Sequence, residues 1–125
     1  MTSRWAARIM ATVAILFLLF DCVIKIARLA PAVEGTVKLG YPASVVVGIG
    51  LIELLCLVVY VVPATSVLGA VLLTGYLGGA VATHVRVGNP WMTHILFPVY
   101  VAVLLWTPLV FRDPRVRALV PFAGR

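Results

Sequence analysis

The stretch that decides the fold is ARIMATVAILFLLFDCVIKIA, residues 7–27, which holds only three charged side chains, Arg8, Asp21 and Lys25. A helix of this length rises roughly 30 Å, the thickness of the hydrocarbon core of a bilayer. The segment follows basic residues, as the apolar part of a signal peptide does. However, no A-x-A-like site follows it, and Asp21 and Lys25 interrupt the place where cleavage would fall. We therefore predict a retained membrane-spanning helix.

Three further apolar segments extend this pattern: residues 43–62, 66–84 and 92–111. The strictly alternating segments of roughly ten residues that build membrane barrels are absent. The link of residues 63–65 is short enough to predict an antiparallel hairpin, and Gly88-Asn89-Pro90 predicts a second turn. The prediction is an all-α integral membrane four-helix bundle, with residues 1–125 as a single transmembrane domain.

The link between the first two spans is longer than the others. Pro31 stands where a helix can begin and Gly40 where one can end. We expect a short helix at the membrane surface over residues 32–39.

The amino-acid composition also indicates an integral membrane protein. The 125 residues are 63% hydrophobic and only 11% charged, and the mean hydropathy is +1.15. A soluble domain is nearer 45–50% apolar and 25% charged, so soluble, disordered, collagen-like and disulfide-scaffold classes are excluded. The net charge of +6 comes from basic residues at the ends of apolar runs. This placement predicts contact with membrane lipid and argues against nucleic-acid binding.

The basic residues also predict the orientation of the chain. Six arginines fall on the face that carries both termini: Arg4, Arg8, Arg112, Arg115, Arg117 and Arg125. The other face has at most four basic residues: Lys25, Arg28, Lys38 and Arg86. Because cytoplasmic loops carry the excess of Lys and Arg, both termini should be cytoplasmic. The predicted location is the cytoplasmic (inner) membrane of a bacterium.

Two features of the last spans concern packing. Gly75 and Gly79 form a GxxxG step, which lets another helix approach closely. We favour packing within the monomer, with a homo-oligomer contact as the alternative. Pro98 and Pro108 each remove a backbone hydrogen bond and should kink the fourth span.

Ionisable side chains inside the spans are the candidate functional residues, because such groups are costly in a bilayer and usually face the bundle interior. Asp21 and Lys25 are four residues apart on one helix face, and Arg28 continues that face. Counted from the cytoplasmic ends, Glu53 lies at a depth of roughly 14 Å, Asp21 at roughly 21 Å, and Lys25 and His84 at roughly 27 Å. His94 and Tyr76 complete the predicted pocket lining.

Each group also has a structural interpretation. Asp21 and Lys25 could be an ion pair that only helps the helix insert, and the two histidines could be interfacial. Glu53 has no cation one turn away in its own helix, so it must be protonated or paired across the bundle with Lys25 or His84. Glu53 and His84 are the candidate acid and base. We predict no metal site, because the HxxH and HExxH spacings are absent. We also predict no disulfide between Cys22 and Cys56, because the two residues differ by roughly 13 Å in depth.

At these residues the chain resembles the DoxX-like family of small four-helix bacterial membrane proteins. The resemblance rests on four segments and their order: residues 20–26 (FDCVIKI), 39–42 (LGYP), 48–54 (GIGLIEL) and 79–84 (GAVATH). It implies a four-helix bundle in which Lys25, Glu53 and His84 are recurring polar positions. The family name comes from a subunit linked to terminal oxidase and thiosulfate:quinone oxidoreductase systems, so the resemblance implies an association with membrane redox chemistry.

Three functions follow as hypotheses. The first is a pocket that binds a quinone or another lipophilic small molecule, with no intrinsic cofactor, in a protein that acts as an accessory subunit beside a redox-enzyme partner. The second is a membrane enzyme, an isomerase or hydrolase that uses acid/base chemistry on a lipophilic substrate. The third is a structural assembly subunit whose polar residues only fix helix packing.

Overall fold

The structure, a computed structural model, describes residues 2–120 and contains no strand within that range. The long helices are α1 (Thr2–Ile26), α3 (Val46–Val61), α4 (Ser66–Arg86) and α5 (Phe97–Arg112). The shorter elements are α2 (Ala30–Lys38), the 3-10 turns η1 (Ala43–Val45) and η2 (Pro63–Thr65), the π-helical turn η3 (Trp91–Ile95), and α6 (Pro114–Leu119).

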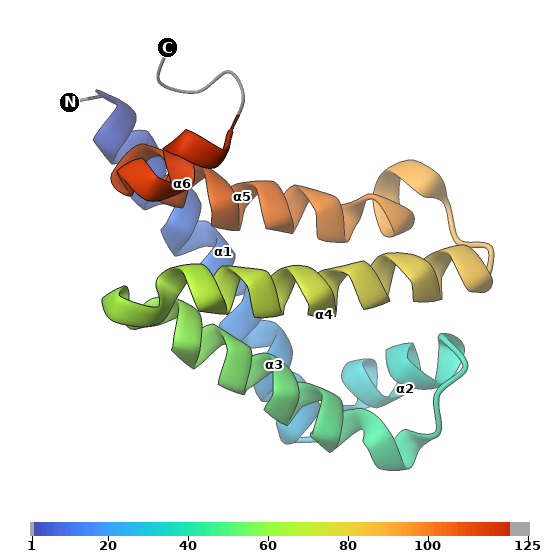
Figure 1. Cartoon of the computed structure of the whole chain (residues 1–125). Helices are drawn as coiled ribbons and strands as arrows, with labels where there is room; N and C mark the ends of the chain where they lie inside the picture. Colours follow the sequence, from blue (N-terminus) through green and yellow to red (C-terminus); the bar gives the residue numbers. More distant parts are fainter. Residues whose placement is uncertain (1, 121–125) are drawn as a thin grey trace.

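Four helical segments are long and apolar enough to cross a membrane: Arg4–Ile26, Ala43–Val61, Pro63–Arg86 and Trp91–Arg112. They agree with the predicted spans to within a few residues. The long helices pack in a ring, with α1 against α3, α3 against α4, α4 against α5, and α5 against α1. Successive long helices run in opposite directions, and α1 is inclined to the others (Figure 1).

Proline and left-handed backbone positions end the helices. Val62 is extended before Pro63, which ends α3, because a residue before proline avoids the helical region. Gly88, with φ 75°, reverses the chain after α4. Arg28, in the turn that follows α1, is the one described non-glycine residue with a positive φ, 55°. The prediction that Arg28 continues the helix face of Asp21 and Lys25 is therefore wrong, because the helix has ended before it.

The fourth span also differs from the prediction. It is divided at Leu96 into the π-helical turn η3 and the α-helix α5. Pro98 stands in the first turn of α5, where its missing N–H has no helical partner to lose. Pro98 is thus a helix-start residue and not an internal kink. Pro108 is inside α5, as predicted.

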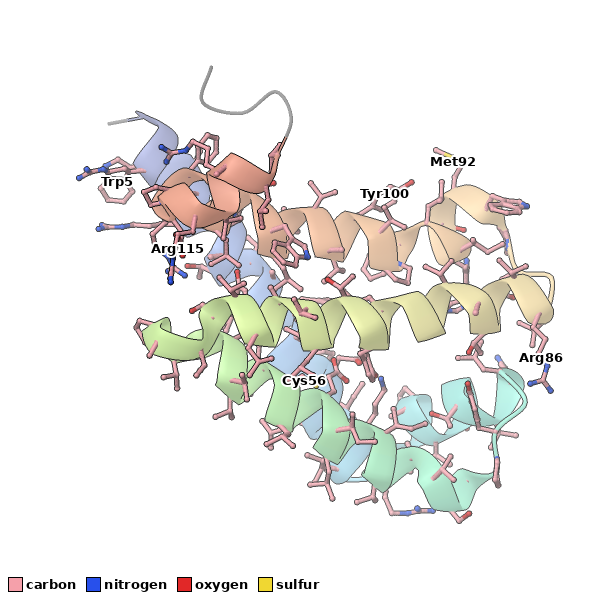
Figure 2. The ribbon with its side chains drawn as sticks, viewed as in Figure 1. Trp5, Cys56, Arg86, Met92, Tyr100 and Arg115 are labelled. Carbon is pink, nitrogen blue, oxygen red and sulfur yellow. The ribbon has the colours of Figure 1, made fainter. Side chains whose placement is uncertain are left out.

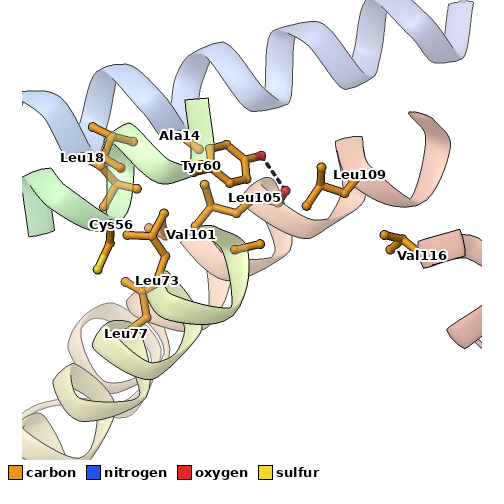
Figure 3. Packing of buried hydrophobic residues seen from close by; sticks show 12 residues of the cluster. Ala14, Leu18, Cys56, Tyr60, Leu73, Leu77, Val101, Leu105, Leu109 and Val116 are labelled. Carbon is orange, nitrogen blue, oxygen red and sulfur yellow. Dashed lines mark hydrogen bonds between the residues drawn. The ribbon is translucent and has the colours of Figure 1, made fainter. Parts of the chain in front are cut away.

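The apolar core lies at the end of the ring near η2 and the chain termini. Ala14 and Leu18 of α1, Leu73 of α4 and Leu105 of α5 are almost completely buried together (Figure 3). Tyr60 adds the core's polar contact, since its hydroxyl donates to the Leu105 carbonyl oxygen at 2.7 Å. The core occupies one end of the bundle and leaves the other end for a cavity.

Glycine sets the closest helix approach at this end. A Cβ atom added to Gly69 would lie 2.2 Å from the Tyr60 backbone nitrogen. From this contact α3 and α4 diverge, and α2 lies towards the open end of the hairpin (Figure 1). By contrast, Gly75 and Gly79 have no atom within 4 Å of an added Cβ. The favoured interpretation of the GxxxG step, packing within the monomer, is therefore wrong.

Basic residues lie at both ends of the bundle. Trp5 and Arg115 lie at one end of the bundle and Arg86 at the other (Figure 2). The Arg117 guanidinium donates to the Val110 and Phe111 carbonyl oxygens, at 3.1 and 2.6 Å, and so caps the end of α5. Arg125, which was counted for the orientation, lies outside the described residues.

The short helix α6 was not predicted. Its N-cap is Asp113, whose Oδ1 accepts from the Arg115 backbone N–H at 2.9 Å. The Arg115 side chain also contacts this carboxylate, and both interactions lower the pKa of Asp113. A six-residue helix carries too weak a periodicity to be found in the sequence, but the Asp-Pro pair is a helix-start signal.

Candidate functional site

A cavity of about 660 Å³ lies between α1, α2, α3, α4 and the start of α5. It falls within the 300–1,000 Å³ range of small-molecule sites. All six residues predicted to line a pocket line this cavity: Asp21, Lys25, Glu53, Tyr76, His84 and His94. Their roles towards a ligand stay predictions, but the structure brings them to one space.

Four of these residues form a hydrogen-bonded group, which we name the inner cluster: Asp21, Lys25, Glu53 and Tyr76. Lys25 is its centre, because the ammonium Nζ donates to Asp21 Oδ2 at 2.6 Å, to the Tyr76 hydroxyl at 2.8 Å and to Glu53 Oε1 at 3.3 Å. The Tyr76 hydroxyl in turn donates to Glu53 Oε1 at 3.0 Å. An ammonium has three N–H donors, so Lys25 has none left for a ligand.

Glu53 is the member of the inner cluster that is completely buried and has an oxygen without a hydrogen-bond partner. Its side chain is completely buried (0% exposed), whereas that of Asp21 is 28% exposed. Glu53 Oε1 accepts two hydrogen bonds, but Oε2 is buried and has no partner. A buried polar atom without a partner costs roughly 1–3 kcal/mol, so this oxygen calls for an explanation.

A second polar group, the outer cluster, comprises His84, Asn89 and His94. The Asn89 side-chain amide lies 2.7 Å from His84 Nδ1, and the two imidazole rings meet edge to face with centroids 5.8 Å apart. The amide N–H of Asn89 donates to Nδ1, which places the ring hydrogen of a neutral His84 on Nε2. His84 thus has one polar atom, Nε2, that no described residue binds.

The inner and outer clusters are separate. Tyr76 and His84 are eight residues apart on α4, which corresponds to roughly 12 Å along the helix axis. Lys25 contacts Tyr76, so it lies at the level of Tyr76 and not at that of His84. The prediction that Lys25 and His84 share one depth is wrong, because it counted residues along helices taken as parallel, and α1 is inclined (Figure 1). Of the two partners expected for Glu53, the structure has Lys25.

Small and apolar side chains line the cavity between the clusters, among them Ile49, Gly79, Ala80 and Val101. Ala32 and Thr36 line the α2 side, and the Thr36 hydroxyl donates to the Ala32 carbonyl oxygen of its own helix, 2.8 Å away. The cavity therefore offers polar groups at two levels, joined by a mostly apolar wall.

Sequence reasoning missed three residues of this site. Asn89 was assigned only to a turn, yet it orients His84. Tyr41 and Thr83 also line the cavity and join the α2 side to α4 through a 2.8 Å contact between their hydroxyls. A turn residue next to a candidate histidine is the signal that could have identified Asn89. The pairing of Tyr41 with Thr83 depends on tertiary structure alone.

Within residues 2–120 no group of three or more His, Cys, Asp or Glu side chains is placed to hold a metal ion. Cys22 and Cys56 are both buried as free thiols.

Four apolar spans around a cavity with buried ionisable residues define a multi-span helical membrane protein. The chain belongs to the DoxX-like family, whose family model matches residues 9–107. The matched region includes the inner and outer clusters. No curated protein and no solved structure matches the chain.

Proposed function

We propose that this membrane protein binds a lipophilic carbonyl compound of the quinone type, with the carbonyl oxygen of the ligand at Glu53 Oε2. One observation carries the proposal: the inner cluster satisfies every polar atom that it buries except this one. A ligand that supplies the missing hydrogen bond would remove the cost of the unpaired atom.

Charge balance supports a ligand that accepts, not donates, at this point. Asp21 and Glu53 are two carboxyl groups that share one ammonium, Lys25. With both carboxyls ionised, the cluster would carry one uncompensated negative charge in an apolar cavity, which is costly. A proton on Glu53 makes the cluster neutral, and Asp21 is the better carboxylate because it is partly exposed and only 2.6 Å from Lys25.

The hydrogen bonds select the position of that proton. Glu53 Oε1 accepts from both Lys25 and Tyr76, so the proton resides on Oε2. Oε2 is then an O–H donor to a quinone or ketone oxygen, in competition with the Asp21 carboxylate, which is also within hydrogen-bond reach of the Glu53 carboxyl group.

The location of the protein is part of the proposal. We take the chain to reside in the inner membrane of a bacterium with both termini cytoplasmic, because five described arginines lie at the end with the termini: Arg4, Arg8, Arg112, Arg115 and Arg117. The end with α2 has three basic residues outside the inner cluster: Arg28, Lys38 and Arg86. In this orientation the outer cluster faces the periplasmic side, and α2 lies at that membrane surface.

The test compares two replacements of one residue. Glu53→Gln keeps a donor, since its amide N–H₂ occupies the place of Oε2–H while its carbonyl oxygen accepts from Lys25 and Tyr76. Glu53→Leu removes the donor and leaves Lys25 paired with Asp21. For decyl-1,4-benzoquinone and protein in dodecyl maltoside, we expect Glu53→Gln to bind within about threefold of wild type and Glu53→Leu to bind about 5- to 150-fold more weakly.

The matched control is Glu34→Leu, which changes an exposed glutamate of α2 outside the cavity lining and should leave affinity unchanged. Wild-type affinity in Glu53→Leu, or no binding by the wild type, would overturn the proposal. Full loss in Glu53→Gln with a retained fold would show that the charge of Glu53 matters, and would favour the acid/base enzyme. Turnover of a lipophilic ketone would then be measured next.

A further inference from the structure

The cavity has a second polar centre that the proposed function does not use. We propose that the ligand is ditopic: an elongated apolar molecule that carries a carbonyl at the inner cluster and a second oxygen that accepts a hydrogen bond from His84 at the outer cluster. The inference rests on the proposed function, because the inner oxygen is the one assigned to Glu53.

The first observation that supports a ditopic ligand is that each end of the cavity has a polar atom without a protein partner. At the inner end Glu53 Oε2 is buried without a partner, and at the outer end Nε2 of the partly exposed His84 has no partner among the described residues. Asn89 holds His84 Nδ1 at 2.7 Å and thereby fixes which nitrogen can face a ligand. Each end of the cavity thus presents one hydrogen-bond donor whose neighbouring atoms are already bound.

The second support is the wall between them. Over the roughly 12 Å from Tyr76 to His84 along α4, the residues of this helix that line the cavity are Leu77, Gly79, Ala80 and Thr83. Thr83 is engaged, because its hydroxyl donates to the Gly79 carbonyl oxygen and contacts the Tyr41 hydroxyl, both at 2.8 Å. The middle of the cavity therefore offers contact area and no free polar group on this helix.

The third support is shape. A cavity of about 660 Å³ that spans two clusters is long, and Ala32 and Thr36 of α2 line one side of it. A compact quinone ring could contact only one cluster. A molecule that is oxygenated at both ends fills the length and pairs both donors.

The test uses a homologous series of probes. Alkyl-1,4-benzoquinones with a terminal hydroxyl are compared with equally long probes that end in a methyl group, and the tail length is varied. We expect the terminal hydroxyl to increase affinity about tenfold, the contribution of one well-placed hydrogen bond. The gain should appear only over a narrow range of tail lengths, of the order of the roughly 12 Å between the levels of Tyr76 and His84 on α4.

Variants locate the gain. His84→Phe should abolish the gain from the hydroxyl, so that hydroxyl-ended and methyl-ended probes of equal length bind with the same affinity. Glu53→Leu should weaken both kinds of probe. The matched control is Trp91→Phe, an exposed aromatic residue at the same end of the bundle that does not line the cavity. It should retain the gain.

The outcomes separate the two proposals. If methyl-ended probes bind through Glu53 but no tail length gives a gain from the hydroxyl, the ditopic ligand is refuted and the proposed function stands. A gain that persists in His84→Phe also refutes it. If no probe binds to the wild type, the proposed function itself fails, and the ditopic ligand fails with it.

Discussion

Replacement of Lys25 by methionine should destabilise the protein far more than replacement of either carboxylate. The Lys25 ammonium makes three contacts of 2.6, 2.8 and 3.3 Å, and its side chain is only 17% exposed. Removing one member of a buried ion pair costs roughly 3–5 kcal/mol, because the partner charge is left uncompensated. Asp21 retains partial exposure, so we expect about 3 kcal/mol, which raises the unfolding equilibrium constant about 150-fold.

Asp21→Asn should have a smaller effect. Lys25 then still faces Glu53 Oε1 at 3.3 Å, and Glu53 can ionise to become its counterion. We expect a cost of about 1 kcal/mol, the value of one hydrogen bond. The double variant Asp21→Asn/Lys25→Met removes both charges and should lie within about 1 kcal/mol of wild type.

The assay is reversible unfolding in mixed dodecyl maltoside and SDS micelles, followed by far-ultraviolet circular dichroism. Lys38→Met is the matched control, because Lys38 is an exposed lysine in α2, and it should change the free energy of unfolding by less than about 0.5 kcal/mol. If the two single effects add in the double variant, Asp21 and Lys25 do not form a coupled pair. The assignment of the proton to Glu53 would then lose its basis.

Further predictions concern the scaffold. Gly69→Ala should cost about 1–3 kcal/mol, because its Cβ would meet the Tyr60 backbone, whereas Gly75→Ala should be neutral or stabilise by up to about 1 kcal/mol; the same micelle unfolding assay measures both, and equal effects would contradict the packing described. Tyr60→Phe should cost about 1 kcal/mol in that assay through loss of a buried hydrogen bond, and an unchanged stability would argue against that bond. Because the pKa of Asp113 is lowered, its cap on α6 is complete above the ordinary pKa of a free Asp and is lost as pH falls through the lowered pKa. Hydrogen exchange at the Arg115 amide, measured relative to its intrinsic rate, should therefore accelerate over that pH range in the wild type. The same profile should be flat in Asp113→Asn.

Much of the fold could be predicted because membrane spans depend on local properties. Length and hydropathy alone place the four spans, and proline and glycine place the links. Pro98 shows the limit of this reasoning. A proline inside an apolar run can kink a helix or begin one, and only the π-helical turn before it decides between these alternatives.

The inner cluster was partly predictable. Asp21 and Lys25 are paired by helix periodicity, and the cost of a buried carboxylate indicates that Glu53 needs a partner. The positions of the inner and outer clusters along the bundle axis could not be predicted, because they depend on helix inclination, which is set by packing between helices. The unpaired oxygen of Glu53 was likewise outside the reach of the sequence, since it depends on which neighbours point at each carboxylate oxygen.

The contact at Gly69 has a consequence for where in the bilayer a ligand can reside. The cavity is lined by residues of α3 and α4 that lie beyond the close approach of these helices at this glycine. The position of one residue without a side chain therefore helps to set where along the bundle the cavity lies. A close approach of the two helices two turns further along α4 would displace the cavity by roughly 10 Å, so a residue that does not line the cavity contributes to its depth.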